Sequence, residues 1–315
     1  PFALMVRDIE AARRLVTLSD QAVAAMQSSA CPIVLAPRRE NCDLATTIAP
    51  GTHRLGVMLP YTPIQHLIFH EADETLGPLV MTSANATDEP LVIDNDDALD
   101  RLNGLCDAIL WHDRPIERCV DDSVLIDFSD GDPLPVRRSR GYVPMELPLP
   151  VPSEDGLCVG GELKNTITVV RDGRAIISQH IGDLKHPLAY RHFERAIDDM
   201  VRLFHVQPRW LACDLHPQYM STTITDRLAE RFNAPVLQVQ HHHAHAAALL
   251  AEHARLDPIL ALVCDGVGYG SDGTIWGGEL LRADLSGFDR LLHLRPLRLP
   301  GGDAAAKDAR RCGLA

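Results

Sequence analysis

The chain contains 315 residues, of which 46% are hydrophobic and 23% are charged, and its formal net charge at pH 7 is −13. A single hydrophobic core stops growing at about 250–300 residues, so this length favours two domains. The acidic balance lacks the electrostatic footprint of a nucleic-acid-binding protein, and no apolar run reaches the roughly 18 residues of a transmembrane helix. We therefore expect a protein that binds neither membrane nor nucleic acid. Because nothing at the start resembles a signal peptide, we also expect it to be cytoplasmic.

Residues 1 to about 146 alternate short apolar runs with loops, a pattern typical of a mixed α/β domain. Residues 9–29 contain two helical patterns, and Ser19 and Asp20 are good N-cap candidates for the second. Apolar runs bounded by turn residues predict buried strands. The predicted strands of this region are 31–37, 56–60, 78–84, 106–113 and 122–128.

Two polar motifs lie in this first region. Thr82–Asn85 (TSAN) directly follows a predicted strand, where small hydroxyl and amide side chains supply neutral hydrogen-bond partners to a ligand. By chemistry alone, a plain β-turn is the more common interpretation of this motif. The basic run VRRSRG (136–141) offers guanidinium donors for phosphate or carboxylate, although a solvated edge strand is the favoured interpretation without further information.

Residues 141–156 are rich in proline, which suits neither a helix nor a central strand, so we expect an extended linker near residue 150. Beyond it, Asp172-Gly173 between two β-rich runs predicts a tight hairpin. Residues 186–206 predict a long amphipathic helix with Pro187 in its first turn.

Strands and helices alternate through the rest of this second region, which implies a largely parallel α/β sheet. We expect a Ser or Thr side chain to cap the predicted helix over 221–233. The other predicted elements are strands at 157–161, 209–215, 234–240, 258–266 and 274–285, and a helix at 241–256.

A strand, a Gly-rich turn and a second strand occur twice in this region, as CVGGELKNTITVV and as VCDGVGYGSDGTIWGGELL. Gly-rich turns between strands present backbone N–H groups to phosphates. This is the layout of the actin- and Hsp70-like ATPase fold, where such hairpins hold nucleotide phosphates. On turn composition alone, two unrelated tight hairpins are an equally good interpretation.

The sequence HHHAH gives the sharpest local signal. His241 and His245 are four residues apart, so on a helix they share one face and suit a single divalent metal. His242 and His243 would point elsewhere. Asp265, at the end of a predicted strand, is the nearest candidate for a third ligand, although it could instead orient a metal-bound water or a phosphate.

The eight cysteines are isolated, and no Cys-x-x-Cys pair occurs, which argues against a zinc ribbon or a thioredoxin-type site. Several lie in apolar runs, such as GLCVG and LALVCDG. We therefore expect buried, reduced thiols in a cytoplasmic protein.

Longer motifs now add a resemblance. TSAN, with GVMLPYTPIQHLI upstream and RRSRGYVP downstream, resembles the adenylate-forming YrdC-type domain. GGELKNT, SQHIGDL, CDLHPQYMST, VQHHHAH and CDGVGYGSDGTIWGGE resemble a carbamoyltransferase domain. Together these motifs, in order and over essentially the whole chain, resemble the HypF family of hydrogenase-maturation carbamoyltransferases.

The resemblance implies an α/β fold with two partial domains. It places a YrdC-like adenylate-forming domain at 1–146, a Pro-rich linker at 147–156, and the first half of an actin/Hsp70-like (ribonuclease-H-like) ATPase-type domain at 157–315. It also implies that carbamoyl phosphate and ATP form carbamoyl-adenylate, with Mg²⁺ at the phosphates. The carbamoyl group would then pass to the C-terminal cysteine of the partner HypE, as precursor of a cyanide ligand of the NiFe centre. None of the eight cysteines of this chain need then be catalytic.

Functional residues carry over by motif. His241 and His245 match the family's metal-binding pair, with Zn²⁺ or Fe²⁺ as the expected ion. Lys164 and Asp265 match the positions that we expect to be catalytic. The matching nucleotide-binding positions are Thr82, Ser83, Asn85, Arg138, Arg140, Gly160, Gly161, Asn165, Gly266 and Gly268.

Departures from the family pattern predict a fragment truncated at both ends. The acylphosphatase-like and zinc-finger modules of the family are not present, nor is the basic stretch that precedes PFALM. The family also continues past residue 315, where an acidic residue resembles a third metal ligand. We expect weak or no complete transfer by residues 1–315 alone. Turnover comparable to a full-length enzyme, with ATP and carbamoyl phosphate, would contradict this.

Three alternatives remain open. A threonylcarbamoyl enzyme acting on tRNA shares both domain types, but the net charge of −13 and the HHHAH and IWGGE motifs argue against it. A small-molecule O-carbamoyltransferase differs only in its acceptor. A metal-dependent hydrolase could also use His241 and His245, although the motif lacks the Glu of HExxH that normally serves as general base.

Overall fold

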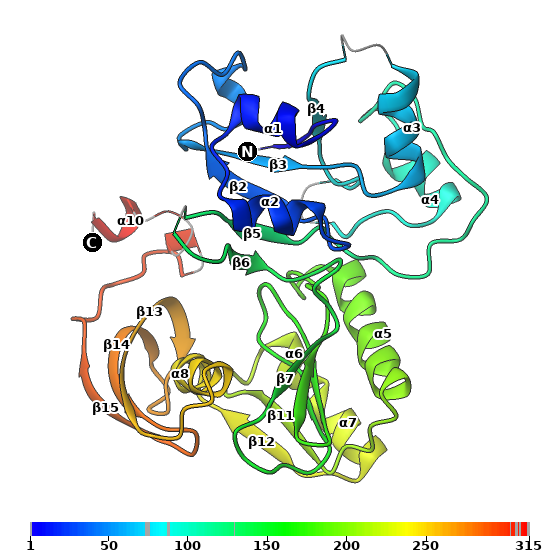
Figure 1. Cartoon of the computed structure of the whole chain (residues 1–315). Coiled ribbons are helices and arrows are strands. Elements are labelled where there is room, and N and C mark those ends of the chain that lie inside the picture. Colours follow the sequence, from blue (N-terminus) through cyan, green and yellow to red (C-terminus); the bar gives the residue numbers. More distant parts are fainter. Residues whose placement is uncertain are drawn as a thin grey trace. The chain divides into compact units, whose positions relative to one another are not determined.

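The computed structural model describes residues 2–72, 76–86, 89–128, 130–302, 304–305, 308 and 310–313, and of Val267 only the backbone. The chain forms two compact units, whose elements are labelled in Figure 1. The first comprises residues 1–145 and 178–182, and the second comprises residues 146–177 and 183–315.

The first unit is built on a mixed six-stranded sheet of order β4-β1-β3-β2-β5-β6. Strands β1 and β3 are parallel, as are β2 and β5, whereas the other neighbours are antiparallel. Leu4, Val34 and Val57 are fully buried in its core. The strands are β1 (Ala3–Met5), β2 (Ile33–Pro37), β3 (Arg54–Met58), β4 (Leu79–Met81), β5 (Val124–Ile126) and β6 (Leu134–Arg137).

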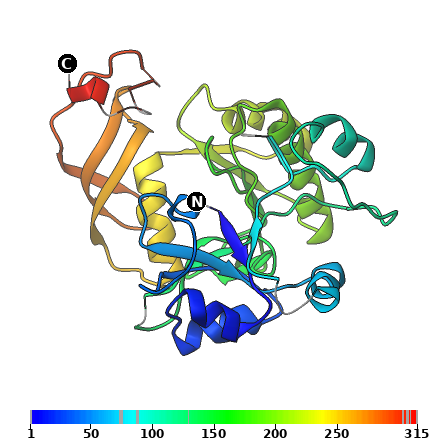
Figure 2. The same ribbon diagram turned by 90° about the horizontal axis from the view of Figure 1, so that it is seen from above.

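Helices α1 (Ile9–Leu15) and α2 (Asp20–Gln27) lie against β3 and β2, as Figure 2 shows. Ser19 caps α2 by accepting a hydrogen bond from the backbone N–H of Ala22, which confirms that cap. The remaining helical elements of the unit are η1 (Thr46–Ile48), α3 (Pro63–Glu71) and α4 (Asn95–Arg101).

The predicted strand at 106–113 is wrong, because this segment forms no strand. Leu110 is 77% exposed and Trp111 is 54% exposed, so the apolar run packs against no core. An apolar run becomes a strand only where a neighbouring strand offers its backbone groups, and in the described sheet no strand pairs with this segment.

The second unit contains a six-stranded sheet of order β12-β11-β8-β9-β10-β7. Strands β8, β11 and β12 are parallel, but β9 and β10 run antiparallel because the hairpin at Asp172-Gly173 turns the chain back. The hairpin is confirmed, and the largely parallel sheet is corrected to a mixed one. The strands are β7 (Met145–Pro148), β8 (Gly156–Cys158), β9 (Thr168–Arg171), β10 (Arg174–Ile177), β11 (Trp210–Asp214) and β12 (Val236–Val239).

Strand β7 overlaps the start of the segment 147–156, which was expected to be a linker. It lies at the edge of the sheet, where proline is tolerated because its missing N–H faces away from the ladder. Residues 147–148 of the expected linker are therefore strand, and residues 149–155 are irregular.

The helices of the second unit follow the predicted order with one correction. The helix α5 (Pro187–Leu203) begins at its proline and buries Phe193, Ile197 and Met200 on one face, which confirms the amphipathic prediction. The helix expected over 221–233 is split at Ile224, and neither half has a side-chain cap. The further helices are α6 (Met220–Thr223), α7 (Thr225–Phe232), α8 (His241–Glu252) and α10 (Arg310–Gly313).

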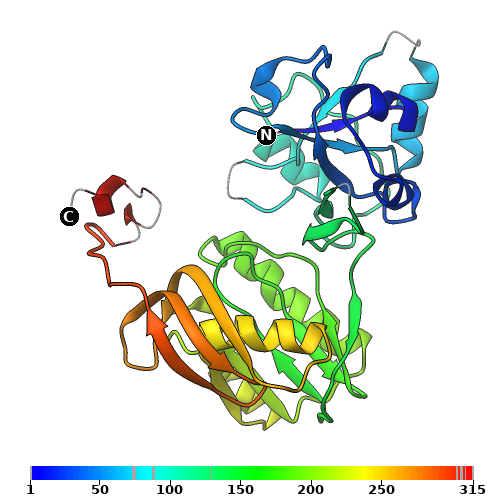
Figure 3. The same ribbon diagram turned by 60° about the vertical axis from the view of Figure 1, so that its left-hand side comes forward.

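A separate antiparallel sheet follows α8. It consists of β13 (Ile259–Tyr269), β14 (Ile275–Ala283) and β15 (Phe288–His293). Figure 3 shows α8 lying along β13 and β14, and Ala246 of the helix packs with Leu281 and Ala283 of the sheet. The first turn of α8 is thereby held close to the end of β13.

The expectation of buried cysteines holds for only part of the set. Cys42 and Cys213 are buried, whereas Cys106 and Cys264 are exposed, and all eight thiols are free. Cys264 is exposed because alternation along β13 turns it to the face opposite Ala261 and Val263, which pack against Ala246 of α8. Within the described residues, no helix is both long and apolar enough to cross a membrane.

Candidate functional site

The first two turns of α8 carry the two histidines singled out by their spacing. The side chain of Gln240 caps the helix by accepting the backbone N–H of His243 at 2.9 Å. His241 is therefore the first helical residue and His245 lies one turn later, with ring centroids 4.9 Å apart. Side-chain capping at this point starts the helix where both imidazoles share one face.

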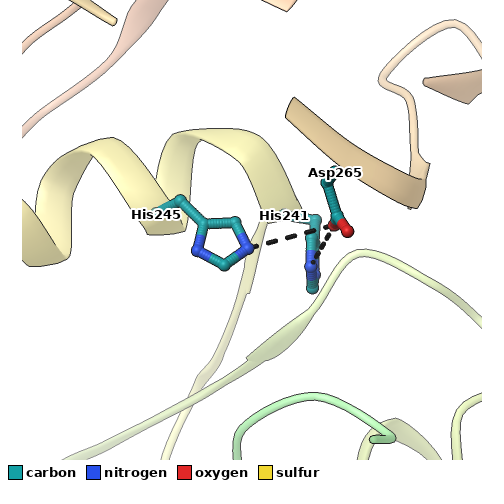
Figure 4. A group of neighbouring side chains, drawn as sticks. All are labelled: His241, His245 and Asp265. Carbon is teal, nitrogen blue, oxygen red and sulfur yellow. Dashed lines mark ion pairs between the residues drawn. The ribbon is translucent and has the colours of Figure 1, made fainter. Parts of the chain in front are cut away.

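Asp265 of β13 joins the two histidines (Figure 4). Its Oδ2 lies 2.9 Å from Nε2 of His241 and 3.9 Å from Nε2 of His245. One ligand atom from each residue lies within 4.8 Å of the others, which is close enough to hold one metal ion. The pairing of β13 with β14 shifts register between Cys264 and Gly268, where Asp265 lies.

A fourth residue of this cluster, Asp214 at the end of β11, was missed by the sequence analysis. Its Oδ2 lies 2.6 Å from Nδ1 of His241, on the side of the ring away from Asp265. The signal was present as a carboxylate near the end of the predicted strand at 209–215, in CDLHPQY. Sequence spacing could not reveal it, because 27 residues separate Asp214 from His241.

The ionisable groups of the cluster shift the pKa values of one another. Hydrogen bonds that the His241 ring donates, first to Asp214 and then to Asp265, raise the pKa of His241 to about 9 despite burial. The same contact with His241 lowers the pKa of Asp265 to about 2. Burial and then the charge of His241 lower the pKa of His245. Two carboxylates around His241 thus favour a positive charge at the cluster, and an imidazole, imidazole and carboxylate set suits a divalent metal.

The other two histidines of HHHAH face elsewhere. His242 is fully buried and places Nε2 3.0 Å from the carbonyl oxygen of Gly277. A Cβ on Gly268 would lie 2.4 Å from Cε1 of His242, so glycine is required for this close approach. His243 places Nε2 2.9 Å from the carbonyl oxygen of Asp284.

The first Gly-rich turn lies beside the histidines, and a cavity of about 480 Å³ extends between them. Gly160 has φ of +69°. Gly161 lies near His241, because a Cβ built on Gly161 would be 3.8 Å from Cε1 of His241. Small or apolar side chains dominate the wall. The described lining residues are Cys158, Gly160, Gly161, Thr166, Thr168, Ala212, Cys213, Asp214, Val239, His241, Ala244, His245 and Ala248.

Two expected residues of this turn have different surroundings. The buried Asn165 donates its amide to the carbonyl oxygens of Val159 and Gly161, at 2.9 and 2.7 Å, so it shapes the turn from behind. Lys164 is exposed and is not among the described residues that line the cavity. In the second Gly-rich turn, the N–H of Gly266 bonds to Oδ1 of Asp265 at 2.6 Å, while Gly268 packs on His242.

A polar cavity of about 350 Å³ lies in the first unit. Thr82 and Ser83 line it together with Tyr61 and Arg137. Arg137 was not selected from the sequence, yet it is the arginine of the basic run that lines this cavity. Its guanidinium lies 2.7 Å from the carboxylate of Asp121, which also lines the cavity.

Asn85 and Arg140 lie outside the described lining of this cavity. The amide of Asn85 donates to the carbonyl oxygens of Ala86 and Glu89, so it shapes the loop after TSAN. Arg140 donates to Asp122 at 2.8 Å and to two backbone carbonyls, and its guanidinium stacks 3.4 Å from the ring centre of Tyr61. Arg138 is half-buried and likewise outside that lining.

Comparisons with known families match nearly the whole chain in three consecutive parts. A family model described as telomere recombination (Sua5/YciO/YrdC) matches residues 1–139. A model described as the HypF Kae1-like domain matches residues 152–252. A third, described as the second subdomain of the carbamoyltransferase Kae1-like domain, matches residues 261–315.

Individual relatives agree with these matches. Carbamoyltransferase HypF2 of Cupriavidus necator is 44% identical over 331 residues, covering 100% of this chain and 41% of the relative. HypF of Rhizobium leguminosarum is 44% identical over 319 residues, with the same coverage. A crystal structure of full-length HypF in the phosphate- and nucleotide-bound form matches with a TM-score of 0.90 and 39% identity, over 99% of this chain and 40% of that one. The chain thus spans about two fifths of the length of these relatives.

Proposed function

The chain belongs to the HypF family of carbamoyltransferases, and from this premise we propose that it carries two successive sites of carbamoyl transfer. The first unit forms carbamoyl-adenylate from ATP, and the second unit passes the carbamoyl group to the C-terminal cysteine of a HypE partner. The observation that carries the proposal is the convergence of His241, His245 and Asp265 beside a Gly-rich turn.

The first step joins carbamate to the α-phosphate of ATP. Carbamoyl phosphate and water give carbamate and inorganic phosphate, and a carboxylate oxygen of carbamate then attacks the α-phosphorus. A P–O bond forms, and the bond to the leaving pyrophosphate breaks. Thr82, Ser83 and Arg137 line the first cavity. Their hydroxyls and guanidinium would bind the phosphate charge, with Mg²⁺ accompanying ATP.

The second step moves the carbamoyl group to sulfur. The acceptor thiolate attacks the carbamoyl carbon, a C–S bond forms, and the C–O bond to AMP breaks. The turn at Gly160 and Gly161, braced by Asn165, borders the cavity where the phosphate of the adenylate would bind. The incoming sulfur belongs to the partner, so no cysteine of this chain takes part.

The donor set at the first turn of α8 fits a resident metal. His241 and His245 supply two imidazoles and Asp265 a carboxylate, a combination that binds Zn²⁺ or Fe²⁺. Such an ion, when bound, would supply Lewis acidity for the phosphate or carbamoyl oxygen. His241, His245 and Asp265 would hold this ion beside the cavity.

The test separates the two steps in one protein. The chain and its His241→Ala/His245→Ala double variant are assayed for carbamate-dependent exchange of pyrophosphate into ATP. Both are then assayed for transfer of label from carbamoyl phosphate to the terminal cysteine of HypE. We expect exchange in both proteins, and transfer, even if weak, only without the double substitution.

Two controls sharpen the result. A HypE with its terminal cysteine replaced by alanine should receive no label. Loss of both steps in the double variant, or transfer that survives it, would contradict the division into two sites. Label on tRNA in the presence of threonine, or hydrolysis without ATP, would support the alternative enzymes instead.

A further inference from the structure

Asp214 is buried against the metal cluster, although the proposed chemistry gives it no role. Its side chain is 6% exposed, and both carboxylate oxygens are engaged. Oδ2 lies 2.6 Å from Nδ1 of His241, and Oδ1 accepts the backbone N–H of His216 at 2.8 Å. The backbone carbonyl of Asp214 also accepts the hydroxyl of Thr222. The carboxylate is therefore held at both oxygens.

This contact decides which nitrogen of His241 is free for a metal. A carboxylate only accepts hydrogen bonds, so Nδ1 of His241 carries a hydrogen. In the neutral ring the lone pair then lies on Nε2, which faces Asp265 at 2.9 Å. The hydrogen-bond network thus sets both the tautomer and the orientation of the ring.

His245 differs from His241 in the same cluster. Its side chain is 57% exposed, compared with 24% for His241. Its Nε2 is also farther from Asp265, at 3.9 Å. His241 is therefore the fixed ligand of the pair, and the residue that fixes it comes from a different strand, β11.

We propose that Asp214 is a positioning residue of the metal centre, which holds Nε2 of His241 toward a divalent cation bound with His245 and Asp265. This inference rests on the metal site of the proposed function. Outer carboxylates of this kind also raise the basicity of the coordinating imidazole, and their removal weakens metal binding by about 10–100-fold.

The experiment measures metal affinity and not turnover. Metal-free chain is titrated with Co²⁺, and the visible absorption of the bound ion is followed for the wild type, Asp214→Ala and Asp214→Asn. We expect about 100-fold weaker binding for Asp214→Ala. Asparagine still accepts a hydrogen bond from Nδ1 but carries no charge, so about tenfold weaker binding is expected for Asp214→Asn.

Asp198→Asn is the matched control. It makes the same chemical change at an exposed carboxylate of α5 that pairs with Arg231, and we expect unchanged Co²⁺ affinity. Circular dichroism of the metal-free variants reports their folding. If Asp214→Ala does not fold, the nearly isosteric Asp214→Asn still supplies the comparison.

The outcomes distinguish this inference from the proposed function. Wild-type affinity in folded Asp214→Ala or Asp214→Asn would overturn the positioning role, even if thermal stability fell. No Co²⁺ binding by the wild type would overturn both the metal site and this inference. Co²⁺ binding that is lost in Asp214→Ala, in a chain that neither exchanges pyrophosphate into ATP nor transfers a carbamoyl group, would support the inference and contradict the proposed function.

Discussion

The cavity of the first unit and the cavity beside the histidines of the second unit differ in the partners of their nearby carboxylates. In the first unit, Asp121 pairs with Arg137 at 2.7 Å, and Asp122 pairs with Arg140 at 2.8 Å. In the second unit, Asp214 and Asp265 both contact a single histidine, His241. The described lining of the first cavity combines hydroxyls, one guanidinium and the carboxylates of Asp121 and Asp122, whereas that of the second has imidazoles, one carboxylate and small side chains and no Lys or Arg.

The guanidinium of the first cavity carries a permanent charge, whereas the imidazoles of the second can gain or lose theirs. A guanidinium keeps its charge throughout the accessible pH range, so Arg137 stays positive in the first cavity, where Asp121 pairs with it. An imidazole can lose its proton, so the positive charge of the second site can be replaced by that of a metal ion. The first cavity thereby holds a fixed positive group, whereas the positive charge of the second depends on a proton or a metal ion.

The largest expected effect tests whether the guanidinium of the first cavity serves only the first step. We expect Arg137→Ala to slow carbamate-dependent ATP–pyrophosphate exchange by about 100-fold, because a donor to the developing phosphate charge is lost. Transfer to HypE from carbamoyl-adenylate supplied in the assay should not change. The exposed Arg13, which pairs with Glu10 on α1, provides the control variant Arg13→Ala. Slowed transfer from supplied adenylate would break the separation of the two sites.

A smaller effect distinguishes the two arginines of the first unit. Arg140 stacks on Tyr61 and bonds to Asp122 and two backbone carbonyls, so Arg140→Ala should destabilise the first unit by about 1.5–3 kcal/mol. Arg140→Lys should not restore the lost stability, because an ammonium has neither the planar paired donors of a guanidinium nor a flat face that stacks on the ring. Urea unfolding followed by hydrogen exchange in peptides of the first unit measures the change. Unchanged stability with lost pyrophosphate exchange would instead favour the direct ligand contact expected from the sequence.

The smallest expected effect concerns a thiol in the wall of the second cavity. Burial raises the pKa of Cys158 from its ordinary value of 9.0 to about 12. At pH 8 its thiolate population is therefore small, and iodoacetamide should label it at least about tenfold more slowly than the exposed Cys264. Mass spectrometry of the labelled peptides measures both rates, and equal rates would show that the cavity wall is open to solvent.

The same shift gives a pH dependence of stability. Between pH 9 and about 12 the folded thiol keeps the proton that the unfolded chain loses. Its contribution to stability is therefore present below pH 9 and declines as the pH rises toward 12. Cys158→Ala should flatten this decline in alkaline unfolding curves.

Local chemistry made part of the fold predictable. The hairpin at Asp172-Gly173, the cap at Ser19 and the amphipathic helix α5 depend on neighbours close in sequence, and all three are confirmed. The strand at 106–113 and the parallel sheet were wrong, because pairing depends on which strands meet. Apolar periodicity reports that a segment can be buried but not against what.

The sequence by itself determined the imidazole pair, because His241 and His245 lie one helical turn apart and the helix needs only its own capping residue. It also determined family membership through long motifs in order. Only the tertiary structure decided that Asp214 stands behind His241 and that Arg137, not Arg140, lines the first cavity. The physical reason is that both facts depend on strand ends and strand faces brought together by sheet pairing, over separations that no local periodicity encodes.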